Sequence, residues 1–368
     1  MAAIRVMFAG GGTGGHLFPA IAIADEIKRL EPNAEILFIG TKEKIEARVV
    51  PQKGYAFRTI WISGFHRSLR ISNLLFPLKV LVSLMQSYAI IKQFNPDVVV
   101  GTGGYVSGPI VYMASMMKIP TLIHEQNGYP GVTTRLLGKR VDRVCLTFEQ
   151  AKKYLPRQDN VVVSGNPTRS MLDNVNRNEA CAYFGFDSAG AQKTVLVFGG
   201  SLGAASINEA MMQTLEHWAA HHIRIIWQTG KEDFERVKGA TRRHDGKFIW
   251  VNAFIDRMDY AYAASDVVVC RAGATTIAEL TRLGKPAILI PYPYAAADHQ
   301  TENAKAMAES GAAVMVKDSE ASTRLVELIT SILQDSTKLN EMGNISKKLG
   351  KPRAGKEIAN MIVELKRA

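Results

Sequence analysis

The stretch Phe8-Ala-Gly-Gly-Gly-Thr-Gly-Gly-His16 follows the apolar run Ile4–Phe8, and a second stretch, Phe198-Gly-Gly-Ser-Leu-Gly-Ala204, follows Val195–Phe198. Each lies between a strand-like run and a helix-like segment, where glycine lets the backbone take positive φ and lets a ligand approach closely. The helix that follows such a turn presents unpaired N–H groups and a partial positive charge, which suit phosphate. Two such turns at matching places predict two nucleotide-binding-like domains that face each other, each able to hold an anion.

Length and composition indicate a soluble protein of two domains. The 368 residues are too many for one ordinary core, and 47% hydrophobic with 21% charged residues is usual for soluble domains. Because Ile4–Phe8 runs directly into the glycine turn without a small-residue cleavage pattern, we expect no signal peptide. The three cysteines have neither metal-ligand nor CxxC spacing, so we expect reduced thiols.

The net charge of +11 points to an anionic partner or serves solubility alone. Nucleic acid, an anionic membrane and phosphorylated substrates are the candidate partners. The sequence has no RNP-type aromatic stretch, zinc-finger spacing or basic zipper, so we expect no nucleic-acid partner. It also has no P-loop, no His-Glu-x-x-His motif and no Asp-x-Asp triplet, which excludes P-loop hydrolysis and the usual metal clamp for a nucleotide sugar.

Apolar runs alternate with helical patterns through both halves of the chain. The strands are expected at Ile4–Phe8, Ile36–Ile39, Phe57–Ile62, Val98–Val100, Thr121–His124, Arg143–Thr147, Val161–Val163, Thr194–Phe198, Arg224–Gln228, Phe248–Val251, Val267–Cys270, Ala287–Pro291 and Ala313–Val316. The helices are expected at Pro19–Leu30, Asn73–Phe94, Pro109–Met117, Glu149–Tyr154, Ser206–His221, Tyr260–Ala264, Thr276–Leu283, Asp298–Glu309, Ser322–Leu333 and Gly350–Leu365. The alternation predicts the α/β class, with two doubly wound parallel sheets covered by helices on both faces.

The first glycine turn matches the dinucleotide fingerprint formally, as Gly10-x-Gly12-x-x-Gly15. That fingerprint also expects an acid at the end of the second strand, to bind a ribose hydroxyl. Here the second strand ends Phe38-Ile-Gly-Thr-Lys42, so the acid is missing. The pattern therefore disfavours NAD and favours a turn that binds another phosphate.

Polar residues at two places in the first half are candidates for chemistry. His16 ends the glycine turn near a helix start, where a protonated ring is disfavoured, so it is a candidate base or substrate contact, or merely a hydrogen-bond donor. His124-Glu-Gln-Asn127 closes a buried strand, at the end of a parallel sheet where ligands bind. His124 and Glu125 are as readily explained by a network that holds the domain together, and Asn127 is the better ligand candidate.

The second half has a phosphate-binding pattern of its own in Arg271-Ala-Gly-Ala-Thr-Thr-Ile-Ala-Glu279. Ala274, Thr275 and Thr276 open a helix and can offer backbone N–H and hydroxyl donors to a diphosphate. Glu279 lies one turn further, where it either accepts from two ribose hydroxyls or serves only as a first-turn acid. Asp298, before His-Gln-Thr-Glu-Asn303, is either a ligand contact or an N-cap.

The segment Leu74–Lys92 is the most apolar helix-like stretch. Pro77, Lys79 and Gln86 argue against a membrane-spanning helix. With the basic residues Arg67, Arg70, Lys79 and Lys92 around it, the segment fits a surface that lies on anionic lipid. An ordinary half-buried helix explains the same pattern.

Five motifs together resemble the MurG family of bacterial transferases, which is part of glycosyltransferase family 28. They are Gly11–His16, Gly101–Gly108, His124–Asn127, Gly199–Ala204 and Asp298–Gln300, and they cover nearly the whole chain in the right order. The resemblance implies the GT-B architecture, with two Rossmann-like domains facing a cleft. It implies an enzyme that moves N-acetylglucosamine from UDP to the 4-hydroxyl of undecaprenyl-diphospho-N-acetylmuramoyl-pentapeptide, converting lipid I to lipid II with inversion. No cofactor and no metal ion are expected.

The resemblance also implies roles for individual residues. The donor contacts expected in the C-terminal domain are Arg169, Ser201, Ile255, Ala274, Thr275, Thr276, Glu279 and Gln300. Arg169 and the helix-start donors would offset charge on the departing UDP in place of a metal ion, and Ile255 would hold uracil through its backbone. Thr13, Gly14, Gly15, His16 and Asn127 are expected to reach the donor sugar from across the cleft.

On the acceptor side, the resemblance implies that the diphosphate lies by Gly14, Gly15, Gly103 and Gly104, with Tyr105 beside it. His16 is the expected general base, which typically contributes about 10²–10⁴-fold to the rate. Leu202 stands where the family often has glutamine, so we expect no side-chain hydrogen bond there, whereas the backbone donors are unaffected.

Gly165 and Pro167, with the polar stretch Asp173–Glu179 after them, mark the boundary between the two halves, and the resemblance implies what each half binds. We expect an acceptor- and membrane-binding domain at 1–165, a UDP-N-acetylglucosamine-binding domain at 166–345, and a final helix at 346–368 that could pack back on the first domain. The resemblance places the enzyme on the cytoplasmic face of the cell membrane, docked through Leu74–Leu84, with other cell-wall synthesis proteins as further partners. Two alternatives remain: a related GT-B enzyme with another lipid or glycoside acceptor, and a non-catalytic subunit that binds a nucleotide sugar.

Overall fold

The computed structural model describes residues 3–64, 76–168, 172–173, 175–187, 192–200, 202–244, 248–295 and 298–367. The chain divides into two compact units, Met1–Arg169 with Lys351–Ala368, and Ser170–Gly350. From the sequence alone, the boundaries are expected after residues 165 and 345, four and five residues earlier. We refer to the units as the N-terminal and the C-terminal unit and describe each by itself.

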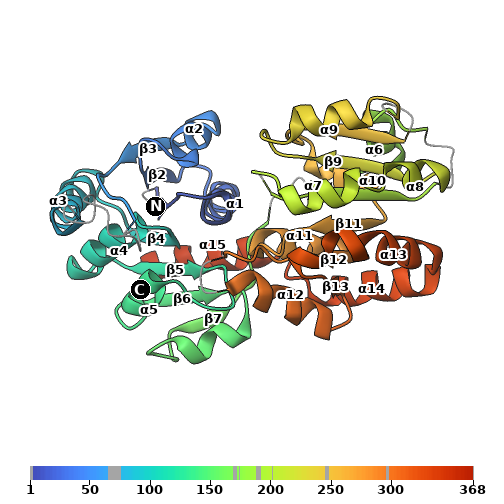
Figure 1. The fold of residues 1–368 in the computed structure, drawn as a ribbon. Coiled ribbons are helices and arrows are strands. Elements are labelled where there is room, and N and C mark those ends of the chain that lie inside the picture. Colours follow the sequence, from blue (N-terminus) through green and yellow to red (C-terminus); the bar gives the residue numbers. More distant parts are fainter. Residues whose placement is uncertain are drawn as a thin grey trace. The chain divides into compact units, whose positions relative to one another are not determined.

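A seven-stranded parallel sheet forms the centre of the N-terminal unit, in the order β3-β2-β1-β4-β5-β6-β7 (Figure 1). Its strands are β1 (Arg5–Gly10), β2 (Glu35–Gly40), β3 (Ala56–Thr59), β4 (Val98–Gly103), β5 (Thr121–Glu125), β6 (Arg143–Leu146) and β7 (Val161–Val163). Every predicted strand of this half is present, because buried parallel strands are continuous apolar runs. The strand order reverses between β1 and β4, which brings the glycine turn after β1 beside the end of β4.

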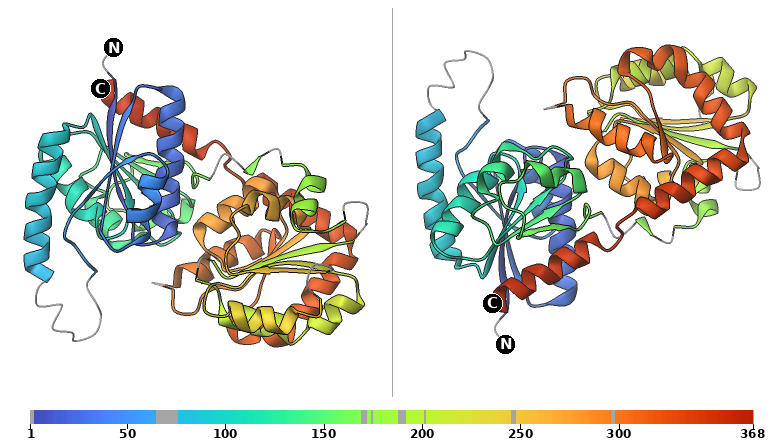
Figure 2. Two further views of the ribbon diagram at one scale, coloured as in Figure 1. Left: turned by 90° about the horizontal axis from the view of Figure 1, so that it is seen from above. Right: turned by 90° about the horizontal axis from the view of Figure 1, so that it is seen from below.

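The helices of this unit are α1 (Gly14–Leu30), α2 (Ile45–Gln52), α3 (Phe76–Phe94), α4 (Ser107–Met116), α5 (Val132–Leu137), the 3₁₀ helix η2 (Glu149–Tyr154) and α15 (Ala354–Arg367). The last helix, α15, lies beside α1 in both views of Figure 2. Ile358, Ala359 and Ile362 of α15 are buried in the same core as β1, β2 and α1. The two ends of the described chain therefore fold into one unit.

A six-stranded parallel sheet forms the centre of the C-terminal unit, in the order β10-β9-β8-β11-β12-β13. Its strands are β8 (Thr194–Phe198), β9 (Arg224–Gln228), β10 (Ile249–Asn252), β11 (Val267–Cys270), β12 (Ala287–Leu289) and β13 (Ala313–Met315). The order reverses between β8 and β11, so the second glycine turn also starts at a point of reversal. The two units repeat one topological plan, as the matching glycine turns predict.

The helices of the C-terminal unit are α6 (Arg177–Tyr183), α7 (Ala205–Met212), α8 (Leu215–Ala220), α9 (Phe234–Thr241), α10 (Met258–Ala264), α11 (Ala274–Leu283), α12 (His299–Glu309), the 3₁₀ helix η5 (Asp318–Glu320), α13 (Ala321–Gln334) and α14 (Ser336–Leu349). The single helix predicted at Ser206–His221 is wrong, because it is two helices. Between them Thr214 has φ −123° and ψ 16°, outside the helical region, and its N–H bonds to the Met211 carbonyl (3.4 Å) instead of continuing the α-helical ladder.

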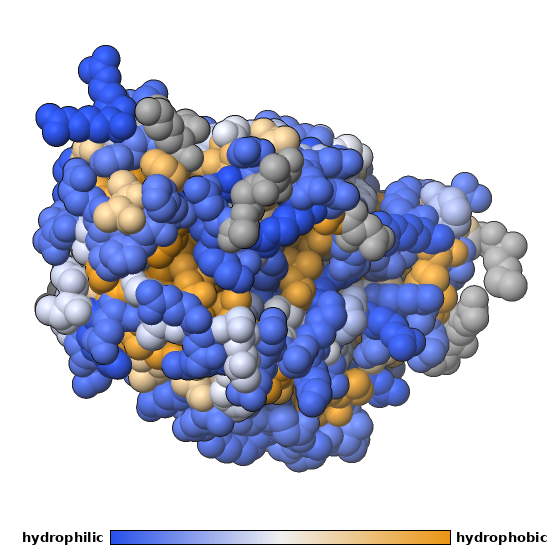
Figure 3. Space-filling model, turned by 90° about the vertical axis from the view of Figure 1, so that its right-hand side faces the viewer, coloured by the Kyte–Doolittle hydropathy of each residue, from blue (hydrophilic) through white to orange (hydrophobic). Residues whose placement is uncertain are grey.

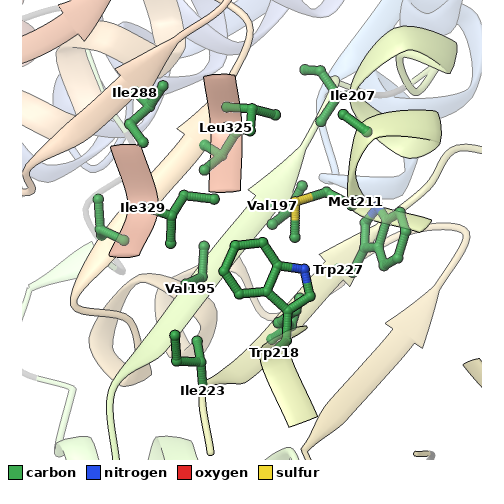
Figure 4. Close-up of a cluster of buried hydrophobic side chains, with 14 of the residues drawn as sticks. Val195, Val197, Ile207, Met211, Trp218, Ile223, Trp227, Ile288, Leu325 and Ile329 are labelled. Atoms are coloured by element: carbon green, nitrogen blue, oxygen red, sulfur yellow. The ribbon is translucent and has the colours of Figure 1, made fainter. Parts of the chain in front are cut away.

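The core of this unit packs the central strand β8 against helices on one face of its sheet (Figure 4). Val195 and Val197 of β8 lie among the fully buried Trp218 and Trp227. The indole N–H of Trp227 donates to the Oδ1 of Asn208 (2.9 Å), so this buried polar group has a partner. Polar side chains cover most of the face drawn in Figure 3, with apolar areas showing between them.

Candidate active site

The glycine turn of the N-terminal unit is held from within by a buried carboxylate. Glu46, at the start of α2, is 1% exposed and accepts from the Gly12 N–H (2.9 Å) and from the N–H and hydroxyl of Thr41 (3.1 and 2.9 Å). Gly12 has φ +86° and open space where a Cβ would stand, so the outer side of the turn is free of protein. Glu46 is not among the residues predicted from the sequence, because no local pattern joins it to a turn that lies 34 residues earlier.

Helix α1 begins at Gly14, five residues before the predicted start at Pro19. Its N-cap, Thr13, has extended backbone and makes no side-chain capping bond. The carbonyl of Thr13 accepts from the N–H groups of His16 (3.3 Å) and Leu17 (3.2 Å), which closes the first helical turn despite its glycines. Thr13, Gly14, Gly15 and His16 therefore form a helix start whose first amides are not capped by the side chain of Thr13.

The end of β4 packs directly on this turn. Gly103 has φ +106°, and a Cβ there would lie 2.5 Å from the Nδ1 of His16. Gly104 has φ +78°, and a Cβ there would lie 2.5 Å from the carbonyl oxygen of Gly11. The structure therefore brings the two predicted glycine motifs together, and only glycine fits at Gly103 and Gly104. Tyr105, the next residue, is 60% exposed.

A chain of hydrogen bonds runs from His16 into the unit. The Nδ1 of His16 is 3.0 Å from the Oε1 of Gln126, whose Nε2 lies 2.8 Å from the Thr102 carbonyl oxygen and 3.0 Å from the Nδ1 of His124. The Nε2 of His124 lies 3.1 Å from the carbonyl oxygen of Gly165. Burial lowers the pKa of His124 to about 4, so the ring is neutral at neutral pH.

Glu125 is a structural acid. It is 4% exposed and accepts from the Asn127 N–H (3.1 Å) and Nδ2 (3.3 Å), the Gly131 N–H (2.9 Å) and the Thr134 hydroxyl (2.7 Å). These bonds fix the loop between β5 and α5. Asn127 is half-buried in that loop, and Glu125 sets the direction of its side-chain amide.

The glycine turn of the C-terminal unit is held by a neutral amide. Gln228, at the end of β9 and 4% exposed, donates from Nε2 to the Gly200 carbonyl (2.8 Å) and accepts at Oε1 from the Ile255 N–H (2.9 Å). Gly200 has φ +89° and open space where a Cβ would stand. Because the N–H of Ile255 is engaged by Gln228, any backbone contact of Ile255 with a base would use its carbonyl. Gln228 is not among the residues predicted from the sequence, although it is a polar residue at the end of an apolar strand.

Helix α11 begins at Ala274, two residues before the predicted start at Thr276. The extended Gly273 is its N-cap and has no side chain to cap it, so Ala274, Thr275 and Thr276 make up the first turn. The hydroxyl of Thr275 is buried and has no protein partner in the structure as described. Glu279 is 3% exposed and accepts from the Tyr262 hydroxyl (3.0 Å).

The remaining candidates of this unit lie around the start of α12. The Oε1 of Gln300 accepts from the N–H of Tyr292 (3.0 Å). Asp298 occupies the N-cap position with φ +52° and makes no side-chain capping bond. Arg271 donates to Ser206, Asp318 and the carbonyls of Ile290 and Pro291, so it ties four segments of the unit together. Arg169, Ser201, Arg67, Arg70 and Leu74 lie outside the described residues.

No group of three or more His, Cys, Asp or Glu side chains among the described residues is placed to hold a metal ion. None of the helices described is both long and apolar enough to cross a membrane.

Comparison with known proteins identifies relatives of both units. Residues 6–146 match the glycosyltransferase family 28 N-terminal domain, and residues 194–358 match the glycosyltransferase family 28 C-terminal domain. The N-acetylglucosamine transferase of Flavobacterium psychrophilum that acts on N-acetylmuramyl-(pentapeptide) pyrophosphoryl-undecaprenol is 42% identical, over 98% of this chain and 97% of that protein. The Bacillus pumilus protein of the same name is 40% identical, over 98% and 99%.

Solved structures are similar over the same length. A crystal structure of Acinetobacter baumannii MurG has a TM-score of 0.76 at 28% identity, covering 98% of this chain and 99% of that one. A UDP-GlcNAc 2-epimerase from Neisseria meningitidis has a TM-score of 0.69 at 14% identity, covering 99% and 100%, which shows a shared fold alone.

Proposed function

Since the chain belongs to glycosyltransferase family 28 and has the GT-B fold, we propose that it transfers N-acetylglucosamine from UDP to undecaprenyl-diphospho-N-acetylmuramoyl-pentapeptide. The acceptor atom is the 4-hydroxyl of the muramoyl sugar, and the anomeric centre inverts. The observation that carries the proposal is identity of 40% and 42% to transferases of that name over 98% of this chain. The product, lipid II, is a peptidoglycan precursor.

His16 is the proposed general base. In the step, the acceptor oxygen forms a bond to the anomeric carbon and its proton passes to a ring nitrogen of His16. The bond from that carbon to the diphosphate breaks, and UDP leaves with the electron pair. What supports the role is the position of the ring at an uncapped helix start, with one nitrogen held by Gln126 at 3.0 Å.

The donor site is proposed in the C-terminal unit. The first turns of α7 and α11 have no side-chain cap, and Gly200 leaves open space beside its turn. Their amides and the unpartnered hydroxyl of Thr275 would bind the diphosphate and offset charge on departing UDP. Glu279, Gln300 and the carbonyl of Ile255 are the proposed contacts with ribose and uracil, and Arg169 and Ser201 complete the proposed set.

The acceptor site is proposed in the N-terminal unit. Gly14 and Gly15 at the start of α1, with Gly103 and Gly104, would bind the acceptor diphosphate, and the exposed Tyr105 would lie beside it. Thr13 and Asn127 remain proposed contacts to the donor sugar. The close packing of Gly103 on His16 supports a site in which the acceptor meets the base.

The surface of α3 is proposed to lie on an anionic membrane at the cytoplasmic face. Its buried residues are Ser83, Ser87 and Ile91, whereas its exposed apolar residues are Leu78 (49% exposed), Leu81 (51%), Met85 (62%) and Tyr88 (46%). Their spacing of three, four and three residues puts them on one side of the helix. Lys79 and Lys92, each near an aromatic ring, supply positive charge at this surface.

A transfer assay tests the function. Radiolabelled UDP-N-acetylglucosamine is incubated with the full chain and lipid I, and in parallel with diacylglycerol and a soluble glycoside. We expect labelled lipid II and no other labelled product. Transfer to diacylglycerol but not to lipid I, or binding of UDP without any transfer, would contradict the proposal.

Vesicle binding tests the membrane surface separately. We expect Leu81→Glu to weaken binding to phosphatidylglycerol vesicles and to leave transfer to a short-chain, soluble lipid I analogue unchanged. Leu349→Glu, at a 43% exposed leucine of α14, is the matched control and is expected to bind vesicles like the wild type. Equal binding by both variants would rule out the α3 surface.

A further inference from the structure

The orientation of the Gln126 side chain is fixed by its neighbours. Its Nε2 faces the carbonyl oxygens of Thr102 (2.8 Å) and His124 (3.2 Å), and a carbonyl oxygen only accepts hydrogen bonds. The nitrogen of the amide must therefore point there, which leaves the oxygen, Oε1, pointing at the Nδ1 of His16 (3.0 Å). The protonation of His16 and His124, the two histidines in this hydrogen-bond chain, follows from this one orientation.

His124 supports the same orientation from behind. Its Nε2 faces the Gly165 carbonyl oxygen (3.1 Å) and so carries the proton, which leaves its Nδ1 to accept from the Gln126 amide (3.0 Å). Burial keeps the His124 ring neutral, so its Nδ1 stays an acceptor. A flipped Gln126 would face two carbonyl oxygens with its own oxygen, and no donor would remain for His124.

We infer that Gln126, held by Thr102 and His124, fixes neutral His16 as the Nδ1–H tautomer and so makes Nε2 the proton acceptor of the transfer reaction. Nδ1–H donates to an amide oxygen that only accepts, which leaves the lone pair on Nε2. Gln126 and His124 are positioning residues, because they act through His16. The catalytic part of this inference rests on the proposed function.

Gln126 also suits the charged state of the ring. When Nε2 takes the proton of the acceptor hydroxyl, His16 becomes a cation, and its Nδ1–H bond to Oε1 becomes charge-assisted and stronger. A neutral amide fixes the tautomer without placing a carboxylate beside the ring. Gly103 leaves the space in which the ring lies, since a Cβ there would be 2.5 Å from Nδ1.

The tautomer is tested by NMR on the full chain labelled with ¹⁵N-histidine. Two-bond ¹H–¹⁵N spectra at neutral pH distinguish a protonated from an unprotonated ring nitrogen. The eight histidines are few enough for His16→Ala and His124→Gln spectra to assign the two signals. We expect a protonated Nδ1 for His16 and a protonated Nε2 for His124. A protonated Nε2 on neutral His16 overturns the inference whatever the activity.

Gln126 variants test the catalytic consequence. Gln126→Leu is expected to give mixed His16 tautomers and to lower kcat about tenfold or more, with the KM for UDP-N-acetylglucosamine little changed. Gln126→Glu keeps an acceptor for Nδ1–H, and its second oxygen, which would face the Thr102 and His124 carbonyls, has to carry a proton to donate there; in that form the variant is expected to restore the signal and part of kcat. Asn160→Leu is the control, since Asn160 is an equally buried amide that donates to the Gly138 and Val141 carbonyls away from His16.

The outcomes separate the inference from the proposed function. A folded Gln126→Leu with wild-type kcat, or with no more loss than Asn160→Leu, overturns the catalytic role. A wild type that shows the expected ring signals but never transfers to lipid I overturns the function and leaves the tautomer standing.

Discussion

The two glycine turns have similar backbone conformations but are bonded to different buried side chains. Gly12 and Gly200 both have positive φ and open space on the side of the missing Cβ, and both turns start where a strand order reverses. In the N-terminal unit a buried carboxylate, Glu46, accepts from the Gly12 N–H at 2.9 Å. In the C-terminal unit a neutral amide, Gln228, donates to the Gly200 carbonyl at 2.8 Å.

This difference in charge predicts a difference in ligand. A buried negative charge on the Gly12 N–H disfavours a phosphate against that residue, so the acceptor diphosphate is proposed further along, by Gly14 and Gly15, whereas the second turn has a neutral support. The first turn is also the one followed by His16, whose Nδ1 is held at 3.0 Å by Gln126. We therefore propose that the first turn serves proton transfer and acceptor binding, and that the second serves binding of the UDP diphosphate.

The largest expected effect separates these two roles. We expect His16→Ala to lower kcat by about 10²–10⁴-fold, because the proton acceptor is lost. UDP binding, measured by calorimetry on the same variant, is expected to stay at the wild-type value. If the affinity for UDP fell by as large a factor as kcat, the first turn would also bind the nucleotide.

The pH dependence of stability is the next largest effect, and it concerns the N-terminal unit. The pKa of His124 is lowered by burial from 6.5 to about 4, so below pH 6.5 the unfolded chain binds a proton that the folded chain does not. The contribution of neutral His124 to the free energy of unfolding is fully present above pH 6.5. It falls as the pH drops toward 4, by about 3 kcal/mol in all.

Denaturant unfolding of the wild type and of His124→Gln between pH 7 and pH 4 measures this contribution. The variant is expected to have a flatter profile, since glutamine does not titrate. Gln228, the buried side chain that holds the turn of the C-terminal unit, does not titrate either, so no such loss is expected from that position. Parallel profiles for the two proteins would contradict the assignment.

A smaller effect is expected at the second turn. Gln228→Leu leaves the Gly200 carbonyl and the Ile255 N–H without their partner, at a cost of about 1–3 kcal/mol. We expect the Kd for UDP to rise about tenfold, since both groups border the proposed donor site. Gln126→Leu is the control, because it removes a buried glutamine of the N-terminal unit that bonds to His16 and not to the proposed donor site, and it is expected to leave the Kd for UDP unchanged.

Features that depend on residues adjacent in the sequence could be predicted from the sequence alone. Strands such as Thr194–Phe198 are apolar runs long enough to be recognised, and the glycine turns that follow them are visible as motifs. The starts of α1 and α11 are set by backbone bonds at Thr13 and Gly273, which propensity does not show. Glu46 acts on Gly12 across 34 residues, and such a contact exists only in the folded chain.

The smallest effect is expected from giving the first turn a neutral support like that of the second. In Glu46→Gln the side-chain oxygen can still accept from Thr41, but the new NH₂ group would face the Gly12 N–H and leave it unpaired. We expect a loss of about 1 kcal/mol in the free energy of unfolding, measured in urea, and an unchanged Kd for UDP. Glu26→Gln, at a salt-bridged acid on the surface of α1, is the control and should change stability by less than about 0.5 kcal/mol. If Glu46→Gln weakened UDP binding as much as Gln228→Leu does, both turns would serve one ligand, and the division of roles argued from their charges would fail.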